Sequence, residues 1–216
     1  MPLTRRSSVL GFAALLAAAG LPSAALVRAA VSPSDAPKEA PAAGSLAGQL
    51  LVASPDMGDP RFVGTVILMV RHNKDGAFGI VINRPVEERP IAGLLHALGQ
   101  KDENVEGTIR LFAGGPVEQQ IGFVVHSAEY HRPETLAIDG HVALTSSPEV
   151  LRDIAHHRGP AKSLLAFGYA GWGPGQLEME MAQRTWFVAP ADMALIFDED
   201  RDKLWDAAMA RRVINL

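Results

Sequence analysis

Residues 65–82 read TVILMVRHNKDGAFGIVI, two apolar runs rich in β-branched residues, joined by a short polar loop that ends in Asp75-Gly76. Asp-Gly between two such runs is typical of a β-hairpin. The first run, residues 65–71, has the continuous apolar character of a central strand that is buried on both faces. The hairpin therefore predicts a domain built around a buried sheet.

Further strands are expected on both sides of this hairpin. They cover residues 49–53, 108–113, 121–126, 141–145, 163–169 and 185–189. The segments 108–113 and 121–126 are predicted to form a pair around Gly114-Gly115-Pro116.

Helices are expected between some of these strands. The first follows Pro90, carries apolar residues at helical spacing and ends at Gly99. A second starts at a capping box from Ser146 to Glu149. A third covers residues 177–181, and a last covers 204–212 behind a run of acidic residues. About seven strands and four helices result, and because several strands pair as hairpins, we predict an α+β domain with a mixed sheet.

Residues 1–48 differ in composition from the remainder of the 216-residue chain. Arg5-Arg6 precedes an uncharged stretch rich in Ala and Leu, residues 9–27, and this order is typical of a signal peptide. We therefore predict a signal peptide over residues 1–30, a flexible Pro- and Ala-rich linker over 31–48, and a folded domain over 49–216.

The signal peptide predicts export to the periplasm, and the paired arginines leave the twin-arginine route open. One alternative is a misassigned start codon, with a cytoplasmic protein that begins near Gln49. Another is a membrane anchor, because the 19 residues from 9 to 27 are long enough to cross a bilayer. Gly20-Leu21-Pro22 makes that stretch a weak anchor, so no stable membrane span is expected.

The composition excludes several kinds of chemistry. The chain has no cysteine, which removes disulfides, thiolate metal sites and a cysteine nucleophile. None of the seven histidines pairs with a carboxylate at ligand spacing, so no metal is predicted, and no nucleotide or cofactor motif is present. Beyond residue 30 there are 17 basic and 24 acidic residues, a charge of −7, which argues against direct binding of nucleic acid.

Polar and glycine-rich loops supply the candidate site residues. One loop, residues 54–62, contains Asp59 and Arg61, and another, residues 167–178, places four glycines around two aromatic residues. Such loops let backbone amides and aromatic faces approach a ligand. Spacing alone favours a purely structural role for these residues over a binding site. The predicted ligand-binding residues are Asp59, Arg61, Asn83, Arg84, Gly114, Gly115, Tyr169, Trp172 and Gln176.

At these residues the chain resembles the AlgH/YqgE family of bacterial proteins. The matching stretches are residues 54–85, 111–126 and 167–181, followed by Thr185-Trp186, and the match runs from about Gln49 to the C-terminus. The resemblance implies an α+β domain whose mixed sheet splits and curls into a pseudo-barrel flanked by helices. It implies no particular reaction, and it implies a cytoplasmic protein that lacks the first 48 residues.

Two hypotheses about function follow. The first is a binding or scaffold domain whose loops form a cleft for a small anion or a protein partner, with Arg61 or Arg84 on the anion and Trp172 packed against it. The alternative is a hydrolase or transferase that uses His72 as base with Asp59 or Glu178 as partner. Some family members are called transcription regulators, which the acidic charge does not support. Homo-oligomerisation is left open.

Overall fold

The computed structural model describes residues 44–100, 102, 105–197 and 200–213. The predicted signal peptide and most of the predicted linker lie outside these residues. The strands are β1 (Gln49–Ala53), β2 (Val66–Asn73), β3 (Gly76–Val81), β4 (Pro85–Pro90), β5 (Thr108–Ala113), β6 (Val117–Ser127), β7 (Leu136–Ala137), β8 (Val142–Thr145), β9 (Ser163–Trp172) and β10 (Trp186–Pro190). The helices are α1 (Ile91–Ala97), α2 (Glu149–Ala155), α3 (Gln176–Ala182), α4 (Met193–Phe197) and α5 (Leu204–Ala210), with a short 3₁₀ helix at Arg201–Lys203.

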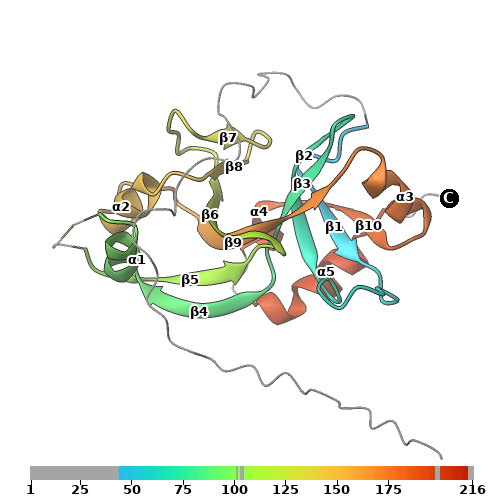
Figure 1. The fold of residues 1–216 in the computed structure, drawn as a ribbon, viewed down its shortest axis with the longest axis horizontal. Helices are drawn as coiled ribbons and strands as arrows, with labels where there is room; N and C mark the ends of the chain where they lie inside the picture. Colours follow the sequence, from blue (N-terminus) through green and yellow to red (C-terminus); the bar gives the residue numbers. More distant parts are fainter. Residues whose placement is uncertain (1–43, 101, 103–104, 198–199, 214–216) are drawn as a thin grey trace, which may run out of the picture.

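One strand, β9, holds the sheet together. Its first half lies between β5 and β6, and its second half pairs with β3, which continues through β2 and β1 to β10. The β5–β9 pair is parallel and the other pairs are antiparallel, so the sheet is mixed. The sheet splits at β9 and curls into a half-barrel (Figure 1). This confirms the predicted α+β class and the fold that the resemblance implies.

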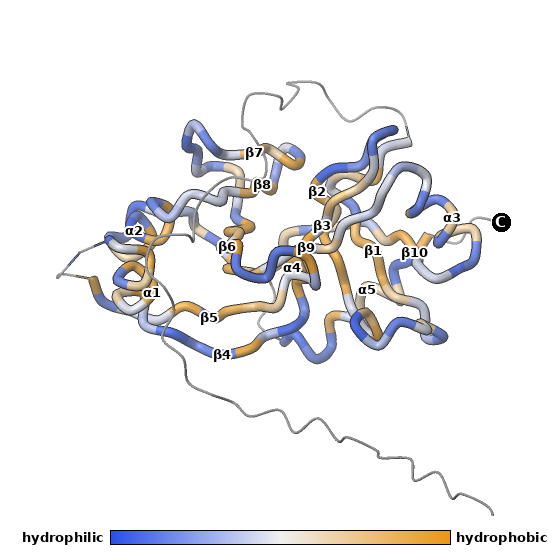
Figure 2. Tube along the Cα trace, viewed as in Figure 1, coloured by the Kyte–Doolittle hydropathy of each residue, from blue (hydrophilic) through white to orange (hydrophobic). Residues whose placement is uncertain are grey.

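Helices flank the curled sheet on both sides. Helices α1 and α2 lie together at one end, beside β4, β5 and β6, whereas α5 packs against β1, β2 and β10 (Figure 1). Three apolar clusters fill the space: one inside the curl, one between the first hairpin and α3, and one beneath α1 and α2. Hydrophobic residues concentrate on the inner strands, while β4 and the peripheral loops are largely hydrophilic (Figure 2). No helix among the described residues is long and apolar enough to cross a membrane.

Three glycines make the split of the sheet possible. Gly114 N–H donates to Phe167 O at 2.7 Å, and Val81 N–H donates to Gly114 O at 2.8 Å, so β3, the 114–116 turn and β9 touch through their backbones. A Cβ at Gly114 would overlap Gly168 O, and one at Gly115 would overlap Tyr169. Gly168 has φ 75°, and a Cβ there would overlap Gly115 O. Only glycine permits this close approach and this left-handed conformation together.

Most predicted strands are confirmed, but one pairing is wrong. Strands β5 and β6 flank Gly114 as expected, yet they do not pair with each other, because β9 lies between them and pairs with both. Strand β4 was not predicted, since its sequence PVEERP is charged, begins and ends with proline, and is exposed at every position. The two-residue β7 was also missed.

The helix predictions are confirmed apart from two details. Helix α1 follows Pro90 and is closed by Gly99 at φ 74°, and the third expected helix is present as α3. The capping box is wrong: α2 starts after Pro148 without a side-chain cap, and the Ser147 hydroxyl, not that of Ser146, donates to Glu149. Helix α4 was missed because its apolar run is only five residues long.

Replacing Gly168 should therefore destabilise the protein strongly. Gly168→Ala forces a Cβ into the left-handed region and against Gly115 O, so we expect the free energy of unfolding to fall by at least about 2 kcal/mol. Gly93→Ala is the control, because Gly93 lies inside α1 with open space around its Cβ position. There the exchange should stabilise by up to about 1 kcal/mol. Denaturant unfolding of both variants measures the change in the free energy of unfolding. Equal changes in the two variants would contradict the requirement for glycine at position 168.

Candidate functional site

The loop before β2 contains the predicted anion-binding pair, Asp59 and Arg61. The Arg61 guanidinium donates to both carboxylate oxygens of Asp59, at 2.7 to 3.2 Å, and the Arg61 N–H donates to the same carboxylate at 2.9 Å. The hydrogen bond from the Arg61 side chain, followed by the one from its backbone, lowers the pKa of Asp59. The charge of Arg61 is thus already balanced by a carboxylate, which leaves little attraction for a free anion.

Asn83 and Arg84 hold the same loop from the end of the hairpin. Asn83 Oδ1 accepts from Val66 N–H at 2.8 Å, and its Nδ2 donates to Gly64 O at 2.9 Å. Arg84 donates to Arg61 O and, at 2.9 Å, to Val63 O. These bonds bring Asp59, Arg61, Asn83 and Arg84 together, and all four fix the loop.

A cleft of about 270 Å³ lies beside the close backbone contact of Gly114 and Gly115 with Gly168, which we call the glycine crossing. Of the predicted residues it includes Gly115. Its other walls come from strands β4, β5, β6 and β9, through Val86, Glu87, Leu111, Phe112, Ala113, Gln119 and Phe167. Val86 was not singled out from the sequence, because an isolated valine in a charged segment carries no signal of a site.

A second cavity, of about 310 Å³, lies between the β7–β8 turn and α4. Its carboxylates are engaged: Asp139 accepts from the N–H groups of His141 and Val142 at 2.7 and 2.8 Å, and Asp192 pairs with Arg211. Neither cavity is lined by Arg61 or Trp172. Within the described residues, no group of three or more His, Asp or Glu side chains is placed to hold a metal ion.

Trp172 and Gln176 both donate hydrogen bonds to one carboxylate, that of Glu180 in α3. Trp172 is buried, and its indole N–H donates to Glu180 at 2.9 Å, as the indole of Trp186 does at 2.8 Å. Gln176 Nε2 donates to the other Glu180 oxygen at 2.9 Å. Glu180, which was not predicted as a site residue, therefore accepts hydrogen bonds from three donors, and the Trp172 side chain is part of the core.

His72 and Glu178 meet, as the catalytic hypothesis requires. His72 Nε2 lies 2.9 Å from Glu178 Oε1, and its Nδ1 lies 3.2 Å from the backbone N of Leu46. Because Leu46 N–H can only donate, Nδ1 accepts that hydrogen bond. Nε2 therefore carries the proton and donates a hydrogen bond to Glu178. A hydrogen bond from its own backbone N–H and then that from His72 lower the pKa of Glu178. Asp59 is bonded to Arg61 instead.

A general base needs a free lone pair, and neutral His72 has none in this arrangement. The imidazole instead holds the segment that precedes β1, through its hydrogen bond with Leu46 N–H. Ser45 Oγ donates to His72 O at 3.0 Å, and Gly48 N–H donates to Met69 O at 2.8 Å. The described contacts thus begin at Ser45, a few residues inside the segment that was expected to be linker.

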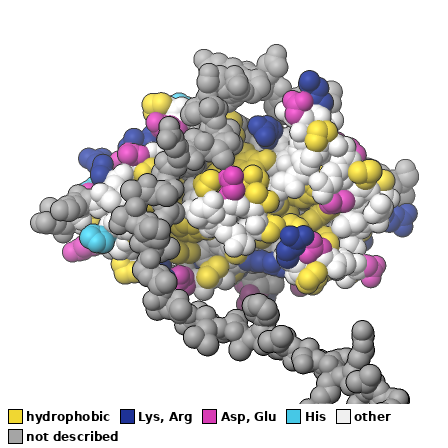
Figure 3. All heavy atoms as spheres, in the orientation of Figure 1, with side chains coloured by type: hydrophobic (Ala, Val, Ile, Leu, Met, Phe, Trp, Pro, Cys, Tyr) yellow, Lys and Arg dark blue, Asp and Glu magenta, His cyan; other side chains and the backbone are white. Residues whose placement is uncertain are grey.

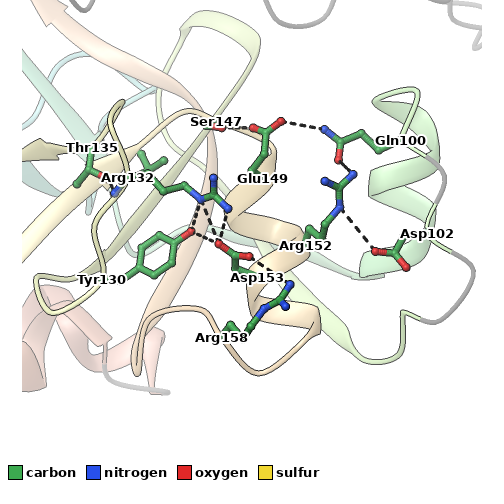
Figure 4. A network of polar contacts seen from close by, with 11 residues as sticks. Gln100, Asp102, Tyr130, Arg132, Thr135, Ser147, Glu149, Arg152, Asp153 and Arg158 are labelled. Carbon is green, nitrogen blue, oxygen red and sulfur yellow. Dashed lines mark hydrogen bonds and ion pairs between the residues drawn. The ribbon is translucent and has the colours of Figure 1, made fainter.

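An unpredicted polar network ties the 128–135 loop to α2. Arg132 donates to Asp153 and to the Tyr130 hydroxyl, both at 2.6 Å, and that hydroxyl donates to Asp153 at 2.6 Å (Figure 4). Burial alone would raise the pKa of Asp153, but the hydrogen bonds from Tyr130 and Arg132 outweigh it and lower that pKa. On the other side of α2, Arg152 contacts Gln100 and Asp102, which joins α1 to α2 (Figure 4).

The fold and this geometry define a class, an α+β half-barrel domain with a small cleft where its sheet divides. The sequence model described as AlgH-like matches residues 50–216, so the chain belongs to the AlgH-like family. It is 44% identical to UPF0301 proteins from Jannaschia sp. (76% of this chain, 86% of the relative) and Rhodospirillum rubrum (78% and 88%).

Two solved structures share the fold. The AlgH protein from Pseudomonas aeruginosa, a UPF0301 member solved in solution, superposes with a TM-score of 0.66 at 37% identity, covering 83% of this chain and 94% of that one. A Corynebacterium diphtheriae protein superposes with a TM-score of 0.60 at 24% identity, covering 77% and 87%. Both likenesses show the fold, and neither protein's name gives a ligand or a reaction.

The tautomer of His72 can be tested directly. We expect ¹⁵N shifts of the imidazole near neutral pH to show a protonated Nε2 and an unprotonated, hydrogen-bonded Nδ1, because Leu46 N–H occupies that lone pair. In Glu178→Gln the Nδ1 shift should persist, since the bond from Leu46 is independent of the carboxylate. A protonated Nδ1, or a solvent-exposed lone pair, would restore His72 as a free base.

His126 predicts a dependence of stability on pH. It is fully buried, its Nδ1 donates to Ser127 O at 3.0 Å, and its Nε2 accepts from Thr145 Oγ1 at 2.8 Å. Burial, opposed by the bond to Ser127, lowers its pKa. The unfolded chain therefore binds a proton more readily than the folded one, so stability is complete above about pH 6.5 and falls as the pH drops below it.

The measurement is the free energy of unfolding against pH for the native protein and His126→Gln. The native protein should lose up to about 1.4 kcal/mol per pH unit more than the variant between roughly pH 6.5 and 5. Comparing the two slopes removes the contribution of the carboxylates, which both proteins share. Parallel curves would show that burial does not lower the pKa of His126 in the folded protein.

Proposed function

We propose that the domain is a partner-binding scaffold, and that the cleft beside the glycine crossing receives an apolar side chain from a basic segment of a protein partner. The observation that carries this proposal is the cleft itself. Its walls include Leu111, Phe112 and Phe167, while Val86 stands at its rim with 64% of its surface exposed. An exposed valine beside an apolar hollow is a surface whose burial by a partner would be favourable.

The form of strand β4 supports insertion of a side chain rather than addition of a strand. β4 is bonded to β5 on one side. Pro85 and Pro90 at its ends lack N–H groups, and charged residues occupy its centre. Those charges are held in ion pairs, Glu87 with Arg89 at 2.9 Å and Glu88 with Arg110 at 3.2 Å. Prolines and paired charges on an edge strand discourage further strands from pairing.

The charge of the chain favours a basic partner. Beyond residue 30 acidic residues outnumber basic ones by 24 to 17. Opposite charge around an apolar anchor accelerates association and fixes register, while the anchor supplies most of the affinity. The same acidity weighs against direct binding of nucleic acid.

A small anion has less support than a protein partner. Arg61 is paired with Asp59, and Arg84 donates to backbone carbonyls, so neither guanidinium is free to grip an anion. The hydrolase or transferase alternative has less support as well, because both nitrogens of His72 are engaged.

Matched substitutions test the cleft. Peptides selected from a displayed random library on the full chain should carry an apolar residue flanked by Lys or Arg. Val86→Glu should weaken a selected peptide at least tenfold, about 1.4 kcal/mol, because it places a charge at the rim of an apolar cleft. Met179→Glu is the control, since Met179 has a similar exposure, 61%, on α3.

Binding is measured by titration calorimetry, and both variants are first checked for native stability. Failure to select such peptides, or equal weakening by the two variants, would contradict the proposed use of the cleft. Loss of affinity only in Val86→Glu, together with a decrease at higher salt, would support both the anchor and the basic flanks.

A further inference from the structure

A chain of three hydrogen bonds links the buried side chain of His126, in β6, to the 128–135 loop. His126 Nε2 lies 2.8 Å from Thr145 Oγ1 of β8, and that oxygen lies 2.8 Å from Thr135 Oγ1. Thr135 Oγ1 in turn accepts from Arg132 N–H at 3.0 Å. His126 and Thr145 are fully buried and Thr135 is half-buried, so the chain runs from the core toward the surface.

Each of these bonds has one possible direction while His126 is neutral. Nδ1 lies 3.0 Å from the carbonyl oxygen of Ser127, which can only accept, so Nδ1 carries the proton. Nε2 then has a lone pair, and Thr145 donates to it. The Thr145 oxygen accepts from the Thr135 hydroxyl, which itself accepts from Arg132 N–H. Every donor and acceptor in the chain is therefore satisfied, as buried polar groups require.

Protonation of His126 would reverse the chain. An imidazolium has two N–H donors and no acceptor, so Thr145 would accept from Nε2 and donate to Thr135. The Thr135 hydroxyl hydrogen would then need a new acceptor, yet among the described residues its oxygen is bonded to Thr145 and Arg132 N–H alone. A buried charge and an unsatisfied hydroxyl are both costly. Water can relieve them at the end of the chain that reaches the surface.

The 128–135 loop packs against the imidazole and is held to α2. The Tyr130 ring lies edge-on to His126, with centroids 5.3 Å apart and planes 86° apart. Asp153 of α2 accepts from the Tyr130 hydroxyl and from Arg132, both at 2.6 Å, and we call these two contacts the latch (Figure 4). Charged side chains of both signs are exposed at the end of the molecule where α1 and α2 lie (Figure 3). Opening the latch would therefore expose the loop to a hydrated surface.

The surroundings of His126 favour its neutral form. Burial lowers its pKa, the bond to the neighbouring carbonyl oxygen and the charge of Glu129 oppose this, and His131 adds to the lowering. Asp153, behind Tyr130, is paired with Arg132. The residues opposite His126 on the neighbouring strands carry no charge: Ala143 of β8 and Ser163 of β9. A loop that opened would return the imidazole to water, so the open state binds a proton more readily than the closed one.

We propose that the 128–135 loop is a pH-sensitive switch, in which protonation of His126 releases the latch while the sheet remains folded. The loop is closed near neutral pH, and opening becomes more favourable as the pH falls below about 6.5. Opening separates Tyr130 and Arg132 from Asp153 and uncovers part of the apolar cluster beneath α1 and α2, against which Tyr130 packs. A fall in global stability with pH needs no such local opening. The inference is also independent of the partner-binding function.

Amide hydrogen exchange of the full chain, followed by NMR, tests the switch. The Arg132 amide should exchange through an opening that costs less free energy than global unfolding, which the amide of Leu68 in the central strand β2 reports. Its protection factor should fall about tenfold between pH 7.5 and pH 5.5, because the open loop gives His126 its ordinary pKa of about 6.5. Exchange of Arg132 only with Leu68, or a protection factor that is independent of pH, would overturn the proposal.

Three variants assign the proton and the latch. In His126→Gln the protection factor of Arg132 should change less than twofold between the two pH values. His131→Gln is the matched control, because His131 is an exposed histidine of the same loop, and it should keep the tenfold change. Loss of the pH dependence in His131→Gln would assign the proton to His131 and overturn the proposal.

Asp153→Asn tests the latch itself, without relying on the folding of His126→Gln. Removing the charge that Arg132 and Tyr130 bind should lower the protection factor of the Arg132 amide about tenfold at both pH values. The further fall between pH 7.5 and pH 5.5 should persist, since His126 is unchanged. Unaltered protection of Arg132 in Asp153→Asn would show that these contacts do not hold the loop, and the proposal would be wrong.

Discussion

The close backbone contact between the Gly114-Gly115 turn and Gly168 is the constraint on which the remaining structure depends. At this point β9 leaves the β5–β6 half of the sheet and joins β3. Side chains at the three glycines would hold these segments apart, and the bond from Gly114 N–H to Phe167 O would be lost. A curled sheet that divides into two halves therefore requires glycine at a specific crossing, rather than flexible loops.

The crossing also decides which surfaces are available for function. It sends Phe167 toward α1 and α2 and Tyr169 into the curl, so one strand serves two different faces. One face has an apolar cleft at the rim of β4, and on the other Tyr169 packs against Phe78 and Phe123. The loops that join the strands are mostly committed to architecture, as the bonds of Asn83 and Arg84 to the 61–66 segment show.

The sequence predicted the fold better than the site. Apolar runs and glycine or proline stops locate β1, β2, β5, α1 and α3, because burial and turn chemistry are local. The insertion of β9 between β5 and β6 is a long-range pairing that no local pattern contains. Gly115 and Trp172 are predicted ligand contacts; Gly115 takes part in a close backbone approach and lines the cleft, whereas Trp172 is buried.

Native-state hydrogen exchange at the crossing tests the central claim most directly. The amides of Gly114 and Val81 donate to Phe167 O and Gly114 O, and both should exchange only when the whole domain unfolds. Their free energies of opening should then equal each other and the global free energy of unfolding. Exchange through a much smaller local opening at either amide would show that the two halves of the sheet separate independently, and the account would be wrong.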